Sequence, residues 1–591
     1  MRTGIFDRMR VIMMAFSDVI VMGLAAGTLL SPFALSADDL SVRALDALTA
    51  SYEGWRTGSV PADRVKAKAA VCLLIAGKLP DKDGRTCEPA MREAVRRILR
   101  PVGNFDVREE VRTDDMREKL AAFAAAPSAE AEALFAELQR EGAGTVRIAS
   151  FRRDITPALG AEICGYAAGQ RSVELHDPLF ACGLCIDDGA DRILIVALDL
   201  LGLDGFVVRD WRAKIAKELG VAPSSVLLTC THTHSGPESC RRLNLPKSVN
   251  QAYLDKLEGI LVDSVRSLAS ATWTECTVSA NSVFPDENVN RRFESSENVV
   301  SYLTHRHEMM PLCRGIADKE LGLLLFYATK REIHPDGPAY VIGNYAAHPL
   351  ASHAPGIGGL RLSADFPGFF RDYLRRETGA EAMFIQGAGG DLLPKEAELG
   401  MDAARKTGVS LAKAAITAMI DARRNPARFL IADPRVGSTI RTYAGTIRSE
   451  FRGRIQEEYN RSDRMTVEVQ CVSVGDYAFA GMPGELTNEL GLEIKWHSPF
   501  RRTWIANLST AYCGYLSPAN FLVQGGYEPR KQPFLSRGSL DFVATAVDAL
   551  TDLRKAVFPV DGCHDDPYPD CLARPLVNVP GGVKHIKFNL R

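Results

Sequence analysis

Short runs of apolar and β-branched residues begin at Thr145 and alternate with longer stretches in which apolar residues recur at helical spacing. The short runs predict strands and the longer stretches predict helices. Residues 179–186 and 193–200 flank a turn rich in Asp and Gly, which indicates a hairpin. The alternation predicts an α/β layered domain with mixed β-sheets and flanking helices. The other expected strands are 146–151, 225–229, 323–327, 340–344 and 382–386, and the expected helices are 210–219, 252–270, 366–378 and 403–419.

The first 37 residues have the pattern of an export signal. Three arginines among the first ten residues precede an apolar stretch over 11–33, and small residues at 34–37 offer a cleavage site. An uncleaved membrane anchor is the less favoured alternative, because only about 12 apolar residues follow Asp18 and roughly 20 are needed to cross a bilayer. We therefore expect an exported protein, periplasmic or secreted, with peripheral membrane contact left open.

Two further segments flank the layered domain, which we expect over residues 145–552. Residues 38–144 show helical spacing of apolar residues, and Ser128 is placed to cap a helix rich in Ala, Glu and Leu. This helical N-terminal region contains no histidine and no Gly-rich loop, so nothing in its sequence points to chemistry. Residues 553–591 are expected to form a Pro-rich tail, and no C-terminal β-sandwich is evident.

The composition narrows the class of protein. The chain has 591 residues, of which 46% are hydrophobic and 24% charged, so a disordered chain and a collagen-like fibre are excluded. Its 71 basic and 73 acidic residues give a net charge of −2, whereas a general nucleic-acid binder needs a basic surface. We therefore expect no nucleic-acid partner, and the composition leaves the oligomeric state open.

Cysteine usage is compatible with export but fixes no disulfide framework. The count of 13 is odd, so at least one thiol stays unpaired. Cys182 and Cys185 form a C-x-x-C pair within an expected strand, where buried small residues are a better interpretation than a metal site. The pairs whose positions favour a disulfide are Cys72 with Cys87 and Cys563 with Cys571.

Three segments bring a histidine or a carboxylate to the end of an expected strand. The first is Thr-His-Thr-His-Ser-Gly-Pro, in which His232 and His234 follow an apolar run. In an extended chain both rings would point to the same side, and a turn at Ser235 could divide their roles between metal binding and proton transfer. The other two segments present His348, beside a proline, and Glu485, after a Met-Pro-Gly turn. Two histidines and one carboxylate, with a position open for water, are a ligand set of catalytic zinc, so the pattern predicts metal-assisted hydrolysis.

In their order along the chain, these motifs resemble the neutral/alkaline (non-lysosomal) ceramidase family. The resemblance covers roughly residues 146–550. It includes Asn-Tyr-Ala-x-His-Pro, Gly-Asp-Leu-x-Pro, Met-Pro-Gly-Glu, and Tyr-x-x-Tyr with a downstream Gln-x-x-Tyr-Glu. The resemblance implies a zinc amidohydrolase of sphingolipid metabolism with a small-molecule or lipid-like substrate.

The resemblance also implies a ligand set for the zinc ion. The ligands would be His232, His348, Glu485 and Tyr515. Tyr527 is the alternative tyrosine ligand, in which case Tyr515 would polarise the substrate.

Catalytic roles follow from the same resemblance. His234 would carry protons, Tyr527 would donate a hydrogen bond to the developing oxyanion, and Arg291 would hold an anionic or hydroxyl-rich part of the substrate. Asp391, after two glycines, is either a helix cap or an active-site carboxylate, and we favour the carboxylate role.

One position departs from the family pattern. The ceramidases carry a serine in Gly-Asp-x-Ser-Pro that is regarded as essential to amide cleavage, and Leu393 stands there in this chain. A leucine side chain can neither attack a carbonyl nor donate a hydrogen bond. Ceramide is therefore one candidate substrate beside another amide, an ester or a sugar derivative, and a non-catalytic binding protein is the remaining alternative.

For other polar residues near these motifs, the sequence gives less support for a role in the predicted site. Asp199 ends an expected strand and either supports a zinc-bound histidine or shapes a turn. His305 and His307 form an H-x-H in a charged segment that we expect to be exposed, and His353 lies in a loop rich in Pro and Gly. We expect none of these three histidines to bind a metal.

Overall fold

The computed structural model describes residues 144–558 apart from gaps at 166–168, 242–248, 295–298, 302–315, 330–336, 351–359, 453–462 and 536. The expected signal peptide, the helical N-terminal region up to residue 143 and the tail beyond residue 558 lie outside the described residues. The same holds for His305, His307 and His353, and for both cysteine pairs proposed from spacing.

The larger sheet of the described chain has eight strands in the order β13-β11-β10-β6-β1-β3-β4-β5. The pairs β4–β5 and β11–β13 are parallel, and the other neighbours are antiparallel. The expected hairpin is confirmed, because β3 and β4 pair in antiparallel register. The strands are β1 (Val146–Asp154), β3 (Phe180–Asp187), β4 (Arg192–Leu198), β5 (Val226–Cys230), β6 (Thr274–Val283), β10 (Leu321–Ala328), β11 (Tyr340–Tyr345) and β13 (Glu381–Gln386).

A second, smaller sheet has the strand order β15-β16-β17-β19 among the described residues. It is antiparallel except for the parallel pair β17–β19. Its strands are β15 (Val436–Thr446), β16 (Arg464–Val474), β17 (Tyr477–Gly481) and β19 (Arg502–Ala506). Short two-stranded pairs join β2 (Glu174–Leu175) to β12 (Arg361–Leu362), β7 (Asn288–Asn290) to β14 (Leu392–Pro394), β8 (Arg292–Glu294) to β9 (Val299–Ser301) and β18 (Glu485–Leu486) to β20 (Tyr515–Leu516).

Two helix ends have residues suited to capping. The Asn250 side chain accepts a hydrogen bond from the Tyr253 amide at the start of α9, and the C-cap residue after α8 is Gly220, which has left-handed backbone angles. No helix in the described ranges is both long enough and apolar enough to span a bilayer. The helices are α8 (Gly205–Leu219), α9 (Gln251–Leu268), α10 (Asp365–Thr378), α11 (Met401–Arg424), α12 (Pro426–Phe429), α13 (Asn488–His497), α14 (Ala519–Gln524), α15 (Tyr527–Arg530) and α16 (Arg537–Val557).

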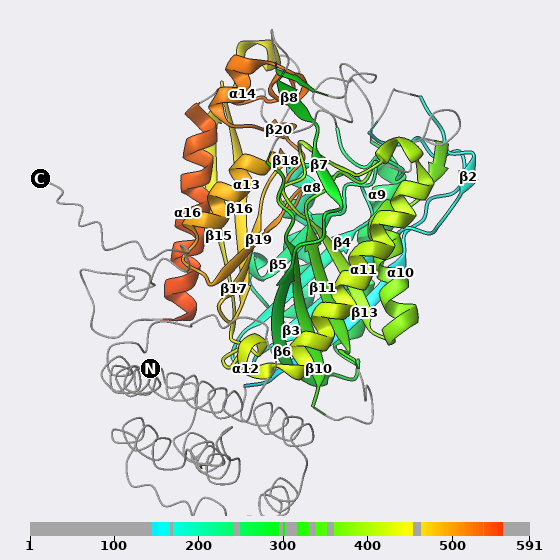
Figure 1. Ribbon diagram of the computed structural model, residues 1–591, viewed down its shortest axis with the longest axis vertical. Coiled ribbons are helices and arrows are strands. Elements are labelled where there is room, and N and C mark those ends of the chain that lie inside the picture. The colour runs from blue at the N-terminus through cyan, green and yellow to red at the C-terminus, as the bar shows by residue number, and fades with distance from the viewer. Residues whose placement is uncertain are drawn as a thin grey trace, which may run out of the picture. The chain divides into compact units, whose positions relative to one another are not determined.

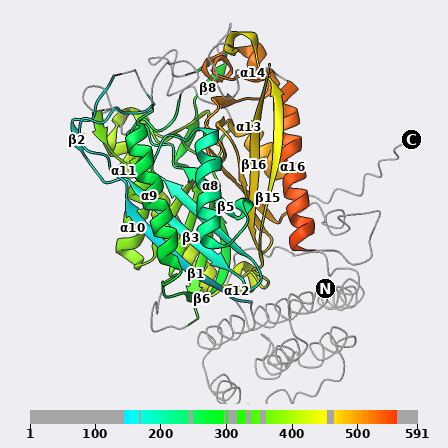
Figure 2. The same cartoon turned by 180° about the vertical axis from the view of Figure 1, so that it is seen from behind.

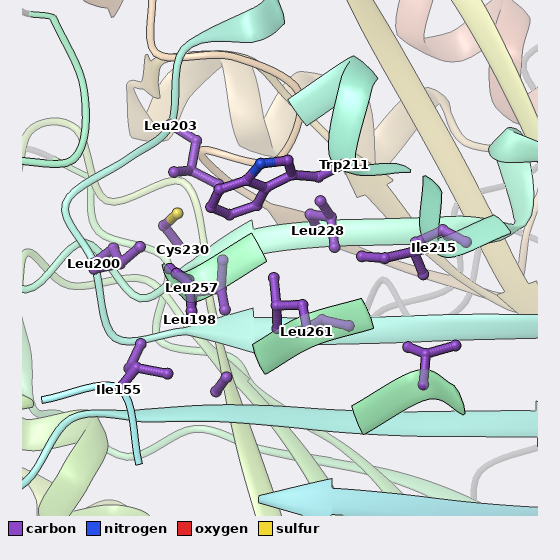
Figure 3. Close-up of a cluster of buried hydrophobic side chains, with 14 of the residues drawn as sticks. Ile155, Leu198, Leu200, Leu203, Trp211, Ile215, Leu228, Cys230, Leu257 and Leu261 are labelled. Carbon is purple, nitrogen blue, oxygen red and sulfur yellow. The ribbon is translucent and has the colours of Figure 1, made fainter. Parts of the chain in front are cut away.

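Alternating side chains of the larger sheet enter two different cores. In β4, Leu194, Val196 and Leu198 pack under α8 and α9. The alternate residues Ile193, Ile195 and Ala197 pack against the smaller sheet. Figure 3 shows the first of these cores, where Trp211 of α8 and Leu257 and Leu261 of α9 lie beside the strands. The strands are therefore apolar on both faces, as their continuous runs of apolar residues predict.

The helices cover the outer face of each sheet. Helices α10 and α11 extend the helical layer over β10, β11 and β13, and α13 and α16 cover the outer face of the smaller sheet. The order of layers is helices, sheet, sheet, helices, with α16 on one side and α10 and α11 on the other (Figures 1 and 2). The expected α/β layered class with mixed sheets is confirmed.

The carboxyl ends of strands from both sheets are tied together by a turn that follows β19. The Asn507 amide donates to the Gln386 carbonyl at the end of β13 (2.8 Å), and the Thr229 hydroxyl of β5 donates to the Asn507 carbonyl (2.9 Å). The Asn344 side-chain amide of β11 donates to the carbonyls of Ile385 (3.0 Å) and Ile505 (2.8 Å). The segments that follow these strands are therefore gathered at one edge, which is where ligands bind in open α/β sheets.

Close packing between the two sheets gives a first prediction. An added Cβ at Gly322 of β10 would lie 2.0 Å from the indole Nε1 of the fully buried Trp504, which donates to Glu320 (3.2 Å). Gly322→Ala should therefore destabilise the protein by about 1–3 kcal/mol, measured by urea unfolding. Gly259→Ala is the control, because that Cβ would meet nothing within 4 Å on the exposed side of α9. It should stabilise by up to about 1 kcal/mol, and an equal loss in both variants would contradict the packing argument.

Candidate functional site

Three histidine rings meet at the gathered strand ends. The Nε2 atom of His232 lies 3.0 Å from that of His348 and 3.3 Å from that of His234, and the last two are 3.1 Å apart. His232 and His348 are buried, whereas His234 is half-buried. These three residues form a group that could hold a metal ion.

The backbone at His232 differs from the expected extended chain. Strand β5 ends at Cys230, and His232 has a φ of 69°, in the left-handed region. The Thr231 and His232 amides donate to the carbonyls of Leu198 (2.8 Å) and Leu200 (2.9 Å), which holds the reversal in place. Such a conformation costs a non-glycine residue roughly 1–2 kcal/mol, so the chain stores strain at a predicted ligand. The two rings still converge, but a backbone reversal brings them together rather than the two-residue repeat of a strand.

The outer nitrogens of the two buried rings determine their tautomers. Nδ1 of His232 lies 2.7 Å from the Leu201 carbonyl, and Nδ1 of His348 lies 3.0 Å from the Gly389 carbonyl. A carbonyl only accepts, so each Nδ1 carries the proton and each Nε2 presents a lone pair in the neutral ring. Burial, with the neighbouring His232 and Arg291, lowers the pKa of His348 well below its usual value, which favours the neutral ring. Two facing lone pairs 3.0 Å apart repel each other unless a proton or a metal ion lies between them.

Glu485 adds a carboxylate to the same group. Its Oε2 lies 3.3 Å from Nε2 of His232 and 3.5 Å from Nε2 of His348. Burial alone would raise the pKa of Glu485, but its interactions with His232 and Tyr515 lower it. The turn before it requires glycine, because Gly484 has a φ of +61° and a Cβ there would lie 2.3 Å from the Gly514 carbonyl.

The distances among these donor atoms fit a tetrahedral zinc ion. Donors bound at about 2.0–2.1 Å to such an ion lie about 3.3–3.4 Å from one another, and the nitrogen and carboxylate oxygen atoms here are 3.0 to 3.5 Å apart. The donor chemistry of imidazole and carboxylate suits the same ion.

A second tyrosine holds Glu485 from the other side. The Tyr512 hydroxyl donates to Oε1 of Glu485 (3.1 Å), which leaves Oε2 facing the histidines. Tyr512 opens the Tyr-x-x-Tyr motif, but it is not among the site residues predicted from the sequence. Its position in that motif was the signal that could have identified it.

Tyr515 and Arg291 lie next to the carboxylate. Tyr515 pairs with Glu485 in the parallel β18–β20 register, and its hydroxyl accepts a hydrogen bond from Nη2 of Arg291 (3.0 Å). Burial and the neighbouring Glu485 raise the pKa of Tyr515 well above its usual value, so its hydroxyl keeps the proton in the absence of a metal. The ring of the half-buried Tyr527 packs edge-on against that of Tyr515, with centroids 5.6 Å apart. Of the two tyrosines, Tyr515 is therefore the one paired with the carboxylate.

Arg291 is fully buried and is held by Glu528, an acidic residue that was not predicted from the sequence. Nε of Arg291 and Nη1 of Arg292 each donate to a different oxygen of Glu528 (2.8 Å in both cases). Glu528 follows Tyr527 in the Gln-x-x-Tyr-Glu motif, so its position in the motif was the available signal. These contacts orient Arg291 so that its Nη2 donates to the Tyr515 hydroxyl.

Asp391 and Leu393 occupy supporting positions. One oxygen of Asp391 accepts from the Asn488 amide at the start of α13 (2.7 Å) and the other from the Asn290 side chain (3.0 Å). Asp391 thus contacts the first amide of α13 from a distant segment, but it is not an N-cap residue, because Thr487 has that position in α13 and strand β14 follows Asp391. Burial raises the pKa of Asp391 to about 6. Leu393 is buried in β14, opposite Val289 of β7.

Asp199 contacts the residue that precedes His232 rather than the histidine itself. Its carboxylate accepts two hydrogen bonds from Arg371 of α10 (2.8 and 2.5 Å) and one from the Thr231 hydroxyl (3.2 Å). The buried ion pair thus holds the residue that precedes His232. No local pattern pointed to Arg371, which lies far away in the sequence.

Comparisons with known proteins identify the fold. No protein-family model and no curated protein matches the chain. The crystal structure of neutral ceramidase from Pseudomonas aeruginosa matches with a TM-score of 0.57 and 17% sequence identity, over 71% of this chain and 76% of that one. A structure of a ceramidase complexed with C2 matches with a TM-score of 0.56 and 16% identity, over 71% of this chain and 77% of that one. The described part of the chain therefore has the fold of the neutral ceramidases, in agreement with the resemblance of its motifs.

Proposed function

We propose that this protein is a zinc-dependent hydrolase that cleaves the amide bond of an N-acylated, lipid-like substrate. The observation that carries the proposal is the convergence of Nε2 of His232, Nε2 of His348 and Oε2 of Glu485 within 3.5 Å of one another, with both rings fixed in the metal-binding tautomer. The neutral ceramidase fold supports the reaction class. The export signal expected from the sequence would place this activity in the periplasm or outside the cell.

His232, His348, Glu485 and Tyr515 would hold the ion. When bound, zinc supplies a Lewis acid and a water molecule acidic enough to act as a nucleophile near neutral pH. Arg291 orients the Tyr515 hydroxyl (3.0 Å), and Tyr512 keeps one oxygen of Glu485 away from the histidines.

His234 is suited to proton transfer rather than to holding the ion. It is half-buried while the other two rings are buried, so its side chain is the one of the three that reaches towards solvent. From there it can take a proton from the nucleophile and return it to the leaving amine. The half-buried Tyr527 would donate a hydrogen bond to the acyl oxygen as negative charge develops on it.

One observation favours a substrate other than ceramide. Leu393 fills the family's serine position with a buried apolar side chain, so no hydroxyl is available there. The second candidate is therefore a zinc hydrolase of the same fold that acts on a different amide, an ester or a sugar derivative.

The division of labour among the histidines can be tested by metal content and turnover. His232→Ala and Glu485→Ala should each lose bound zinc, because each removes a donor atom. His234→Ala should retain zinc and lose about 100-fold or more in turnover, as expected for a proton carrier. His497→Ala, an exposed histidine of α13, is the control and should change neither property. An empty site in His234→Ala, measured by mass spectrometry of bound metal, would make His234 a ligand instead.

A conservative variant tests the hold on the carboxylate. Tyr512→Phe removes only the hydroxyl that binds Oε1 of Glu485, so zinc affinity should fall about 10- to 100-fold. Tyr477→Phe makes the same change in the core between the sheets, where the ring stacks on Trp504, and should leave the affinity unchanged. Competition with a chromogenic chelator measures both, and an unchanged affinity in Tyr512→Phe would show that the hydrogen bond does not position the ligand.

The reaction itself is tested with a substrate panel. The purified chain is incubated with ceramide, other N-acyl lipids, short amides, esters and glycosides, with and without a chelator. We expect cleavage of at least one amide, loss of that cleavage on chelation, and recovery with added zinc. Cleavage that is unchanged after the zinc is removed would overturn the mechanism. A chain that binds no zinc and cleaves nothing would be a non-catalytic relative.

A further inference from the structure

Two buried cysteines lie together beside the candidate site. All the cysteines in the described part of the chain are buried thiols. Cys164 and Cys240 form a small cluster with Leu201, and Tyr512 packs against it. Burial, and then the neighbouring Cys164 thiol, raise the pKa of Cys240, as expected for two thiols that lie close together. By contrast, Cys182 and Cys185, which are close in sequence, belong to the cores on opposite faces of β3.

The backbone is fixed on both sides of this pair. The Cys164 amide donates to the Gly236 carbonyl (2.9 Å), next to a bridge between Ile163 and Pro237. On the other side, the Ser239 hydroxyl donates to the Gly202 carbonyl (2.8 Å), and the Arg241 amide donates to the Asp204 carboxylate (3.0 Å). The two segments that carry the cysteines are therefore fixed by contacts that do not involve the thiols themselves.

We propose that Cys164 and Cys240 are a site of disulfide formation that fastens the two segments around His234. In the reaction, each thiol loses one proton and the pair loses two electrons as the sulfur–sulfur bond forms. A small-molecule disulfide such as oxidised glutathione accepts the electrons and leaves as two thiols. Because burial raises the pKa of the Cys240 thiol and disfavours the thiolate, the exchange takes place while the chain folds.

The disulfide would restrain the segment that packs against the His234 ring. Gly165 follows Cys164, and a Cβ there would lie 2.5 Å from Nδ1 of His234, so the backbone packs directly on that ring. Residues 235–240 lead from His234 to the second cysteine. The disulfide would therefore close a covalent loop of residues 164–240. This loop contains His234, the residue that we propose as the proton carrier. An exported protein meets the oxidising conditions in which such a bond persists.

The test uses the full-length chain, denatured and reduced, and then refolded either with a mixture of oxidised and reduced glutathione or with a phosphine reductant. Remaining thiols are alkylated under denaturing conditions, and the digest is analysed by mass spectrometry without reduction. We expect a cross-linked peptide that contains Cys164 and Cys240 in the oxidised sample and its absence in the reduced one. Alkylation of both thiols in the oxidised sample, or a bond from either cysteine to a different partner, would overturn the proposal.

Two variants check the assignment. Cys164→Ser should leave Cys240 alkylated, whereas Cys471→Ser, a buried cysteine of the smaller sheet, should leave the cross-link intact. Oxidation should raise the urea midpoint of the unsubstituted chain and of Cys471→Ser, but not that of Cys164→Ser. Peptide mapping of the unsubstituted chain decides the question even if a variant fails to fold. It also does not depend on zinc or on any substrate, so its outcome is separate from that of the proposed function.

Discussion

The candidate site depends on an electrostatic conflict in a region from which solvent is excluded. The Nε2 atoms of His232 and His348 face each other at 3.0 Å, and a backbone carbonyl fixes the proton of each ring on its far side. Neither ring can change tautomer without losing that carbonyl contact. Glu485 brings a carboxylate oxygen to the same place. Uncompensated polar groups of one sign are costly away from water, so a positive charge at the centre, carried by a proton or by a metal ion, stabilises the arrangement.

The fold makes this arrangement possible by joining two sheets at the ends of their strands. His232 follows β5 and His348 follows β11 of the larger sheet, while Glu485 follows β17 of the smaller one. Each strand is apolar and buried, which fixes the direction in which the next segment leaves the sheet. The contacts of Asn507 with both sheet edges then set the distance between those segments. The shared core between the sheets is thus a condition for the geometry of the site.

The local patterns that predicted this fold are short in range, whereas the features that they missed depend on contacts between segments that are far apart in the sequence. Apolar runs and turn residues locate strands because both act within a few positions. The ligand candidates could be predicted for the same reason, since each follows a strand directly. The left-handed backbone of His232 and the adjacency of Cys164 and Cys240 depend on contacts between distant segments. Tyr512 lay within a recognised motif, but only the folded chain shows that its hydroxyl meets Glu485.

The origin of the donor atoms in two different sheets has a thermodynamic consequence. An ion held by His232, His348 and Glu485 would cross-link the larger sheet to the smaller one, because it would bind residues that follow strands of both sheets. A ligand that binds only the folded state stabilises that state in proportion to the logarithm of its free concentration over its dissociation constant. The free energy of unfolding would then depend on the concentration of the ion in the surroundings. Loss of the ion would destabilise the folded protein as well as remove its proposed activity.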